Sequence, residues 1–223
     1  MESELNSLVE SWKHSVSVLQ DDLTRVLLDD VMFDEMCKAI SESGAKSGFW
    51  IDHYQRLCSA KQAMAVRRIS RGKRGEIGLD KLLRDVAAHS HQLTIEWYRS
   101  QVSTWSGSNE IQDEHFVQQF MERWCNSDNC IDAAIVRQDR KAFKEEVAVV
   151  GRWADTIIAH IFEEPTSADL TWGELRHAFE VVGEQLNRYS HLFFGQTRIY
   201  SPTFVFDWRE PFTRRLFNPA EEI

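Results

Sequence analysis

The chain has 223 residues, 43% of them hydrophobic, which is enough for one folded domain with a substantial core. Its formal net charge of -9 opposes indiscriminate binding to polyanions. The sequence contains no apolar run of about 18 residues, no basic and apolar leader, and only four scattered cysteines. We therefore expect a cytoplasmic protein with reduced thiols and no membrane span.

The four prolines all lie at or after residue 165, so long helices are permitted over most of the chain and an all-α fold is expected. Apolar residues recur at three- and four-residue spacing from Leu5 to Leu27, which predicts a long amphipathic first helix. After the aspartate pair at 29–30, a second, short helix is expected to carry Phe33 and Ile40.

A glycine- and serine-rich stretch at 41–48 precedes a third predicted helix, from roughly Phe49 to Ser70. The spacing of this helix places Arg68 on or beside an inward row that includes Leu57 and Lys61. A charge in that position needs a ligand or a partner. The alternatives that remain open at this point are a bound phosphate, a structural carboxylate, and a side chain that extends its charge to solvent.

The strongest local charge lies between residues 53 and 75, where seven basic residues occur without an acidic one, although acids outnumber bases elsewhere. Contact with phosphate is favoured there and discouraged elsewhere. The alternative is a solvated basic turn around the glycines at 72, 75 and 78. The candidate phosphate or RNA ligands of this stretch are Arg67, Arg71, Lys73 and Arg74.

A fourth helix is expected from Leu79 to Ala87, and further helical segments around 94–105 and 114–125. A long helix is then predicted from about Asp132 to Phe162, ended by Pro165. The polar linker 106–112 separates the two middle segments.

Thr171-x-x-Glu174 has the pattern of a capping box and predicts the start of the last long helix, which Gly195 ends. The sequence is thereby divided into a helical bundle, 1–195, and an irregular tail, 196–223. The tail is rich in aromatic residues, so we expect it to pack on the bundle or on a partner subunit.

Near the end of the long helix, Arg152, Thr156 and His160 form an i, i+4, i+8 row, with the arginine roughly 12 Å along the axis from the histidine. Histidine is suited to proton transfer near neutral pH, and arginine to binding phosphate oxygens. RNA cleavage without a metal needs both functions. No nucleotide-loop, zinc-protease or serine-hydrolase signature occurs, and we expect neither a metal nor a cofactor.

Three blocks resemble the abortive-infection (AbiU-type) branch of the HEPN superfamily: Val66-Arg67-Arg68-Ile69 with the leucines that follow, Ala154 to His160, and Leu175 to Gly195 with the later Phe206-Asp207-Trp208. Together they span roughly residues 49 to 217. The superfamily's R-x(4-6)-H motif places its histidine on His160. Its arginine has no match, because Arg152 is separated from the histidine by seven residues.

The resemblance implies an antiparallel helical bundle, usually a homodimer, whose active members are metal-independent endoribonucleases of phage defence, toxin or stress systems. His160 would then be the general acid or base, Arg68 and Arg152 the phosphate ligands, and Asp155 an orienting carboxylate. The same pocket could instead bind RNA or a nucleotide without cleavage. The alternative function is a non-catalytic helical module for dimerisation or partner docking.

Overall fold

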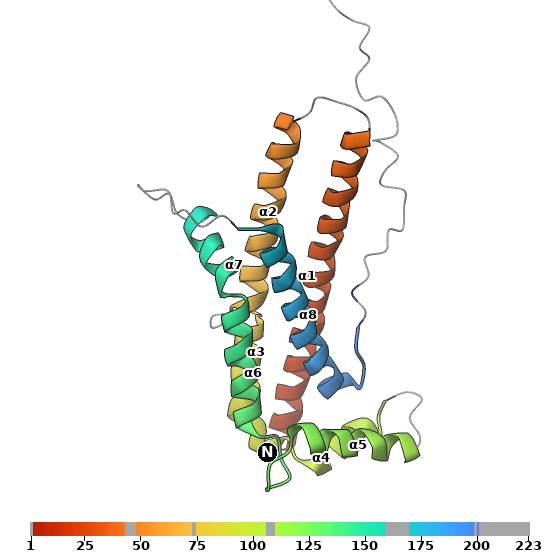
Figure 1. Ribbon diagram of the computed structural model, residues 1–223. Helices are drawn as coiled ribbons and strands as arrows, with labels where there is room; N and C mark the ends of the chain where they lie inside the picture. Colours follow the sequence, from red (N-terminus) through yellow and green to blue (C-terminus); the bar gives the residue numbers. More distant parts are fainter. Residues whose placement is uncertain are drawn as a thin grey trace, which may run out of the picture.

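The computed structural model describes residues 2–42, 48–72, 75–105, 110–158, 170–198 and 200, and these residues form an all-α bundle (Figure 1). Its helices are α1 (Glu2–Glu42), α2 (Gly48–Ser70), α3 (Leu79–His89), α4 (Ile95–Val102), α5 (Glu110–Trp124), α6 (Ala133–Glu146), α7 (Ala148–Trp153) and α8 (Trp172–Phe194). A 3-10 turn (Ser90–Gln92) and a π-helical turn (Ala154–Ile158) complete the described elements. This confirms the all-α fold class.

The long helices α1 and α2 run antiparallel along the length of the molecule, and α8, which is as long as α2, packs against both of them (Figure 1). On the other side, α3 pairs with α6, and α7 continues from α6 along α2. The short helices α4 and α5 lie across the end of the bundle that contains the N-terminus (Figure 1). One hydrophobic core runs through all of these contacts.

The first helix is longer than the sequence predicts, because α1 continues without a break through the expected second helix to Glu42. The aspartate pair does not end it. Asp29 forms an ion pair with Lys61 of α2, and Asp30 with Arg176 of α8. Neighbouring helices therefore supply partners for the two carboxylates, and no glycine or proline is present there to break the helix.

The predicted helix from Asp132 to Phe162 is interrupted. Helix α6 ends at Glu146, α7 begins at Ala148, and from Ala154 to Ile158 the backbone forms a π-helical turn. Three valines in four residues followed by Gly151 give this stretch low helix propensity. The expected core row is buried at Phe143, Val147, Val150 and Ala154, while the remainder of the row lies outside the residues whose side chains are described.

The last helix agrees with its prediction at both ends. The hydroxyl of Thr171 accepts a hydrogen bond from the Glu174 amide, and the Glu174 carboxylate accepts one from the Thr171 amide, so the capping box is formed. Gly195 ends the helix with a φ of 65°, in the left-handed region that favours glycine. All seven apolar positions expected inside are buried: Leu175, Ala178, Phe179, Val182, Leu186, Tyr189 and Phe193.

Only the beginning of the predicted tail belongs to the described residues. Arg198 forms an ion pair with Asp21 of α1 at 2.7 Å. The Asn187 side-chain amide donates a hydrogen bond to the Arg198 carbonyl and accepts one from the Arg198 amide. Tyr200 is partly buried near Gly183 and Leu23. These contacts hold the start of the segment against α1 and α8, and the prediction for residues 201–223 lies outside the described part. Of the helices described, none has the length and apolar character that crossing a membrane requires.

Candidate functional site

Helix α2 is rotated differently from the prediction, and Arg68 does not face the core. Leu57 is 52% exposed, and Lys61 and Arg68 are also exposed. The buried face is instead formed by Gln62, Ala63, Ala65, Val66, Ile69 and Ser70. The expected inward row is therefore wrong at Leu57, Lys61 and Arg68 and confirmed at Ala65, because the lysine and the arginine lie on the solvent side and the small residues allow α2 to pack closely.

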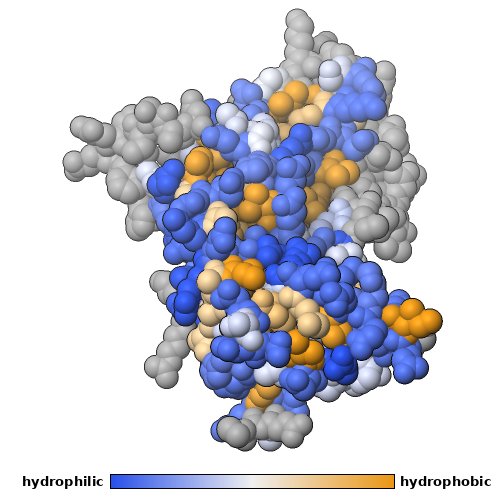
Figure 2. Space-filling model, turned by 60° about the horizontal axis from the view of Figure 1, so that its bottom comes forward, coloured by the Kyte–Doolittle hydropathy of each residue, from blue (hydrophilic) through white to orange (hydrophobic). Residues whose placement is uncertain are grey.

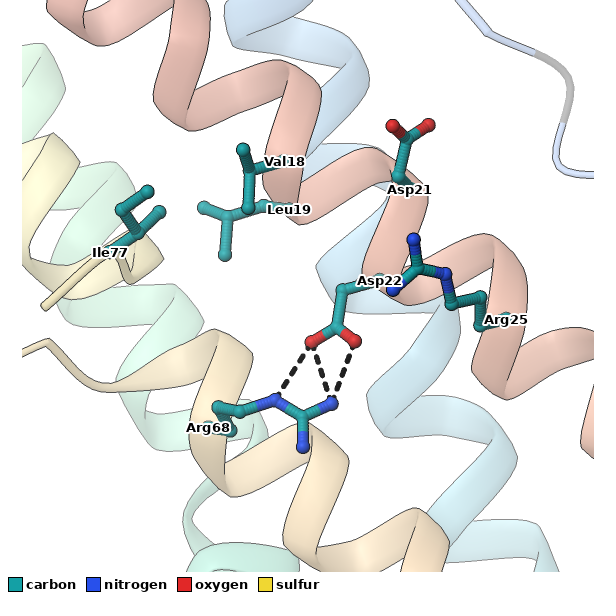
Figure 3. A pocket seen from close by; sticks show the side chains of 7 residues that line it. All are labelled: Val18, Leu19, Asp21, Asp22, Arg25, Arg68 and Ile77. Atoms are coloured by element: carbon teal, nitrogen blue, oxygen red, sulfur yellow. Dashed lines mark hydrogen bonds and ion pairs between the residues drawn. The ribbon is translucent and has the colours of Figure 1, made fainter.

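Arg68 has a carboxylate partner on α1. Its Nε lies 2.9 Å from Oδ2 of Asp22, and its Nη2 lies 2.7 Å from Oδ1, so the guanidinium holds the carboxylate in a fork (Figure 3). Of the alternatives left open by the sequence, a structural carboxylate is the one found. The pair lines a shallow groove of about 360 Å³ together with Val18, Leu19, Asp21, Arg25 and Ile77.

The other arginines at this end of α2 meet a different carboxylate. Nε of Arg67 lies 2.5 Å from Oδ1 of Asp155, and Nη1 of Arg71 lies 3.0 Å from the same oxygen. The second nitrogen of Arg71 bonds the other oxygen, Oδ2. Arg71 follows the last residue of α2, and its amide donates to the Arg67 carbonyl at 3.2 Å, so the two side chains project on one side toward the π-helical turn. We call these three residues the Asp155 cluster.

The Asp155 cluster is open to solvent and carries excess positive charge. The side chains of Arg67, Arg71 and Asp155 are 33%, 50% and 32% exposed. Hydrogen bonds from Arg71, and then from Arg67, hold the pKa of Asp155 below its usual range, so it is ionised at neutral pH. Two guanidinium groups therefore share one negative charge. Arg152, one turn earlier, is exposed and has no ion-pair partner among the residues described.

A π-helical turn presents Asp155 to the two arginines. Turns of this kind are rare and occur frequently at functional sites. Ala154 beside it is fully buried, which fixes the turn in the core while Asp155 faces outward. His160, five residues further along, lies outside the described residues, as do Lys73 and Arg74. The predicted approach of His160 to Arg68 or Arg152 therefore lies outside the described residues.

Four of the five described basic residues of this stretch contact aspartates that are distant in the sequence. Lys61 pairs with Asp29, Arg68 with Asp22, and Arg67 and Arg71 with Asp155. A solvated basic turn does not describe these pairs, and neither does a patch of unpaired cations. Of the predicted site residues, Arg67, Arg71 and Asp155 are brought together, whereas Arg68 is engaged by α1.

A second cluster was not predicted from the sequence. Asp139 of α6 is buried, and Nη1 of Arg188 lies 2.7 Å from its Oδ1. The Tyr189 hydroxyl donates to Oδ2 of Asp139 at 3.2 Å, and the Arg188 guanidinium lies 4.9 Å from the centre of the Trp124 ring. We call these four residues the Asp139 cluster. A signal was present, because Asp139 lies in the same helical row as the buried Val136 and Phe143.

Burial sets the protonation of the Asp139 cluster. It raises the pKa of Tyr189 well above its ordinary value, so the phenol remains a hydrogen-bond donor. Burial also raises the pKa of Asp139, although Arg188 and Tyr189, which contact the carboxylate, oppose the rise. Since Arg188 offsets one buried carboxylate, the cluster is balanced in charge and suited to holding α8 against α6.

Metal ligands do not gather in the described part of the chain, where no three histidine, cysteine or acidic side chains are placed to hold an ion. Comparison of the chain with models of protein families, with curated proteins and with solved structures gave no match.

Proposed function

We propose that this chain is a HEPN-like cytoplasmic domain that acts on RNA in bacterial defence or stress, and that it binds RNA phosphates through the Asp155 cluster. The observation that carries the proposal is the convergence of Arg67 and Arg71 on Asp155, which precedes His160 by five residues in the sequence. Guanidinium groups match phosphate oxygens in geometry and remain charged at every physiological pH. Arg67 and Arg71 therefore replace Arg68 as the phosphate ligands, and Arg152, which has no ion-pair partner among the described residues, adds a further positive charge three residues before Asp155.

The chemistry proposed is attack of a ribose 2′-oxygen on the adjacent phosphorus, with loss of the 5′-oxygen. The new P–O2′ bond forms as the P–O5′ bond breaks, one proton leaves the 2′-hydroxyl, and one is added to the 5′-oxygen. His160 is the candidate for either transfer, because an imidazole titrates near neutral pH. Arg67 and Arg71 would neutralise the charge that grows on the phosphorane oxygens.

The decisive experiment is degradation of single-stranded RNA by purified protein in EDTA. We expect the wild type to cleave and His160→Ala to lose all cleavage. His115→Ala is the matched control, because His115 lies on α5 and bonds only Gln119 of its own helix among the contacts described. Equal cleavage by wild type and His160→Ala would exclude the catalytic assignment. RNA binding without cleavage by the wild type would reduce the function to binding.

The second candidate function is a non-catalytic module for dimerisation or partner docking. The face of the molecule where α4 and α5 lie exposes apolar side chains among polar ones (Figure 2). On α5, Ile111 is 86% exposed and Met121 is 40% exposed. Isolated exposed apolar residues are ordinary on a protein surface, so this function stands second.

Light scattering separates the two functions. If the module is a dimer held by α5, Ile111→Asp should shift the mass of the protein to that of a monomer. RNA cleavage by the same variant is measured in parallel. Truncation after Gly195 tests the tail in the same assay. A wild type that is already monomeric would exclude dimerisation through either surface.

A further inference from the structure

The geometry of the Asp155 cluster points to an occupied anion site: we infer that Asp155 is an internal counter-ion, which a phosphate group of RNA displaces from Arg67 and Arg71. This inference rests on the proposed function and adds a mode of regulation to it. In this scheme the carboxylate weakens RNA binding in the free protein.

The contacts of Asp155 match those that two arginines make with a phosphate. Arg71 offers two nitrogens to the two oxygens, and Arg67 adds a third hydrogen bond. A phosphodiester presents two charged oxygens of similar spacing to the same fork. Since Asp155 is ionised and a phosphodiester carries one negative charge, one anion can replace the other without leaving the guanidinium groups unpaired.

Space for the exchange exists on the solvent side. A side-chain carbon added to Gly151 would lie 3.8 Å from Nη2 of Arg71, and apart from its chain neighbours no other described side chain would lie within 4 Å of it. The missing side chain leaves the flank of the guanidinium uncovered. Half of the Arg71 side chain is exposed, so a phosphate can approach it without moving a helix.

The carboxylate can leave because the bonds that hold it are near the surface. Ion pairs between partly exposed side chains contribute little to stability, so their loss on RNA binding is readily offset. Ala154 keeps the π-helical turn in the core, and rotation of the Asp155 side chain alone removes it from the arginines. The exchange therefore needs no unfolding of α7 or of the turn.

The test compares Asp155→Asn with wild type in binding a single-stranded RNA oligonucleotide, measured by fluorescence anisotropy over a series of salt concentrations. Asparagine keeps the shape and removes the charge. We expect affinity to rise about fivefold, the largest factor that an exposed pair of this kind represents. The plot of log K against log salt should keep nearly the same slope, because the same two arginines neutralise the same phosphate in both proteins.

Asp22→Asn is the matched control, since it makes the same change in net charge and releases Arg68 instead. Its affinity and slope should stay at the wild-type values. Equal gains in both variants would show a general charge effect and overturn the inference. Should Asp155→Asn not fold, as judged by thermal unfolding, Asp155→Ser gives the same comparison.

Binding of pyrophosphate, measured by the shift in melting temperature, distinguishes failure of the inference from failure of the proposed function. If Arg67→Gln and Arg71→Gln weaken RNA binding but Asp155→Asn gains nothing for either ligand, the inference is wrong and the function stands. If RNA does not bind at all, yet Asp155→Asn binds pyrophosphate more tightly than the wild type and Asp22→Asn does not, the anion site stands and its ligand is not RNA.

Discussion

Asp139 and Asp155 are both bound by arginine, in opposite surroundings. The Asp139 side chain is 9% exposed and meets one arginine, a tyrosine hydroxyl and, beyond them, an aromatic ring. The Asp155 side chain is 32% exposed and meets two arginines with no further acid among the partners described. The first arrangement is balanced and closed, and the second has an excess positive charge that solvent can reach. Burial and charge balance thus distinguish an ion pair that stabilises the packing of two helices from an ion pair that an external anion can replace.

The largest effect that tests this comparison is on stability. Asp139→Asn should lower the free energy of unfolding by about 3 kcal/mol, because it removes a buried carboxylate that bonds Tyr189 and Arg188, whose own side chain is 24% exposed. Asp155→Asn should cost less than about 1 kcal/mol, because its partners are exposed. Urea unfolding followed by circular dichroism measures both. Similar losses in the free energy of unfolding would show that the Asp155 cluster also stabilises helix packing.

Binding gives the next largest effect. Arg71→Gln should weaken affinity for single-stranded RNA about tenfold, which corresponds to the loss of one hydrogen bond to a charged group, about 1.5 kcal/mol. Arg140→Gln is the control, because Arg140 pairs with Asp80 at 2.7 Å and its side chain is 31% exposed, similar to the side chains of the Asp155 cluster. Anisotropy titration at one fixed salt concentration compares the two. An equal loss in the control would remove the distinction between this cluster and other surface pairs.

A smaller effect on stability is expected within the Asp139 cluster. Tyr189→Phe removes the hydroxyl that donates to Asp139 and retains the buried ring, so the free energy of unfolding should fall by about 1 kcal/mol. Because the two side chains interact, the double variant with Asp139→Asn should lose less than the sum of the single losses. Losses that add fully in urea unfolding would show that the hydroxyl and the carboxylate act independently.

The smallest effect concerns an exposed pair at the junction of α8 and α6. Nε2 of His177 lies 2.9 Å from the Glu146 carboxylate, and this hydrogen bond raises the pKa of the histidine. A raised pKa contributes stability below the unfolded value, about 6.5, that is lost as pH rises through the folded value. The melting temperature of wild type should exceed that of His177→Gln slightly at about pH 5.5, and the difference should disappear at about pH 9. A difference independent of pH would show that the pair acts through packing.

Patterns within a few residues predicted much of the fold. Thr171, Glu174 and Gly195 marked the ends of α8, and the apolar spacing from Leu79 to Ala87 gave the buried face of α3. The prediction failed where distant partners change local preferences, as at the aspartate pair within α1. It also failed for α2, where long basic side chains were assigned to the inward row.

For the candidate site, the sequence named Arg67, Arg71 and Asp155 and left their relation undecided. It also gave the basic stretch that contains the two arginines, because charge and helical spacing are local properties. Which aspartate each arginine contacts is determined by the tertiary structure. Arg67 and Asp155 are 88 residues apart, and Arg68, turned about 100° from its neighbour, faces α1 instead. Only the packing of α2 between α1 and the π-helical turn decides which arginine meets which aspartate, because ion pairs depend on distances of a few ångströms between elements that the chain connects only remotely.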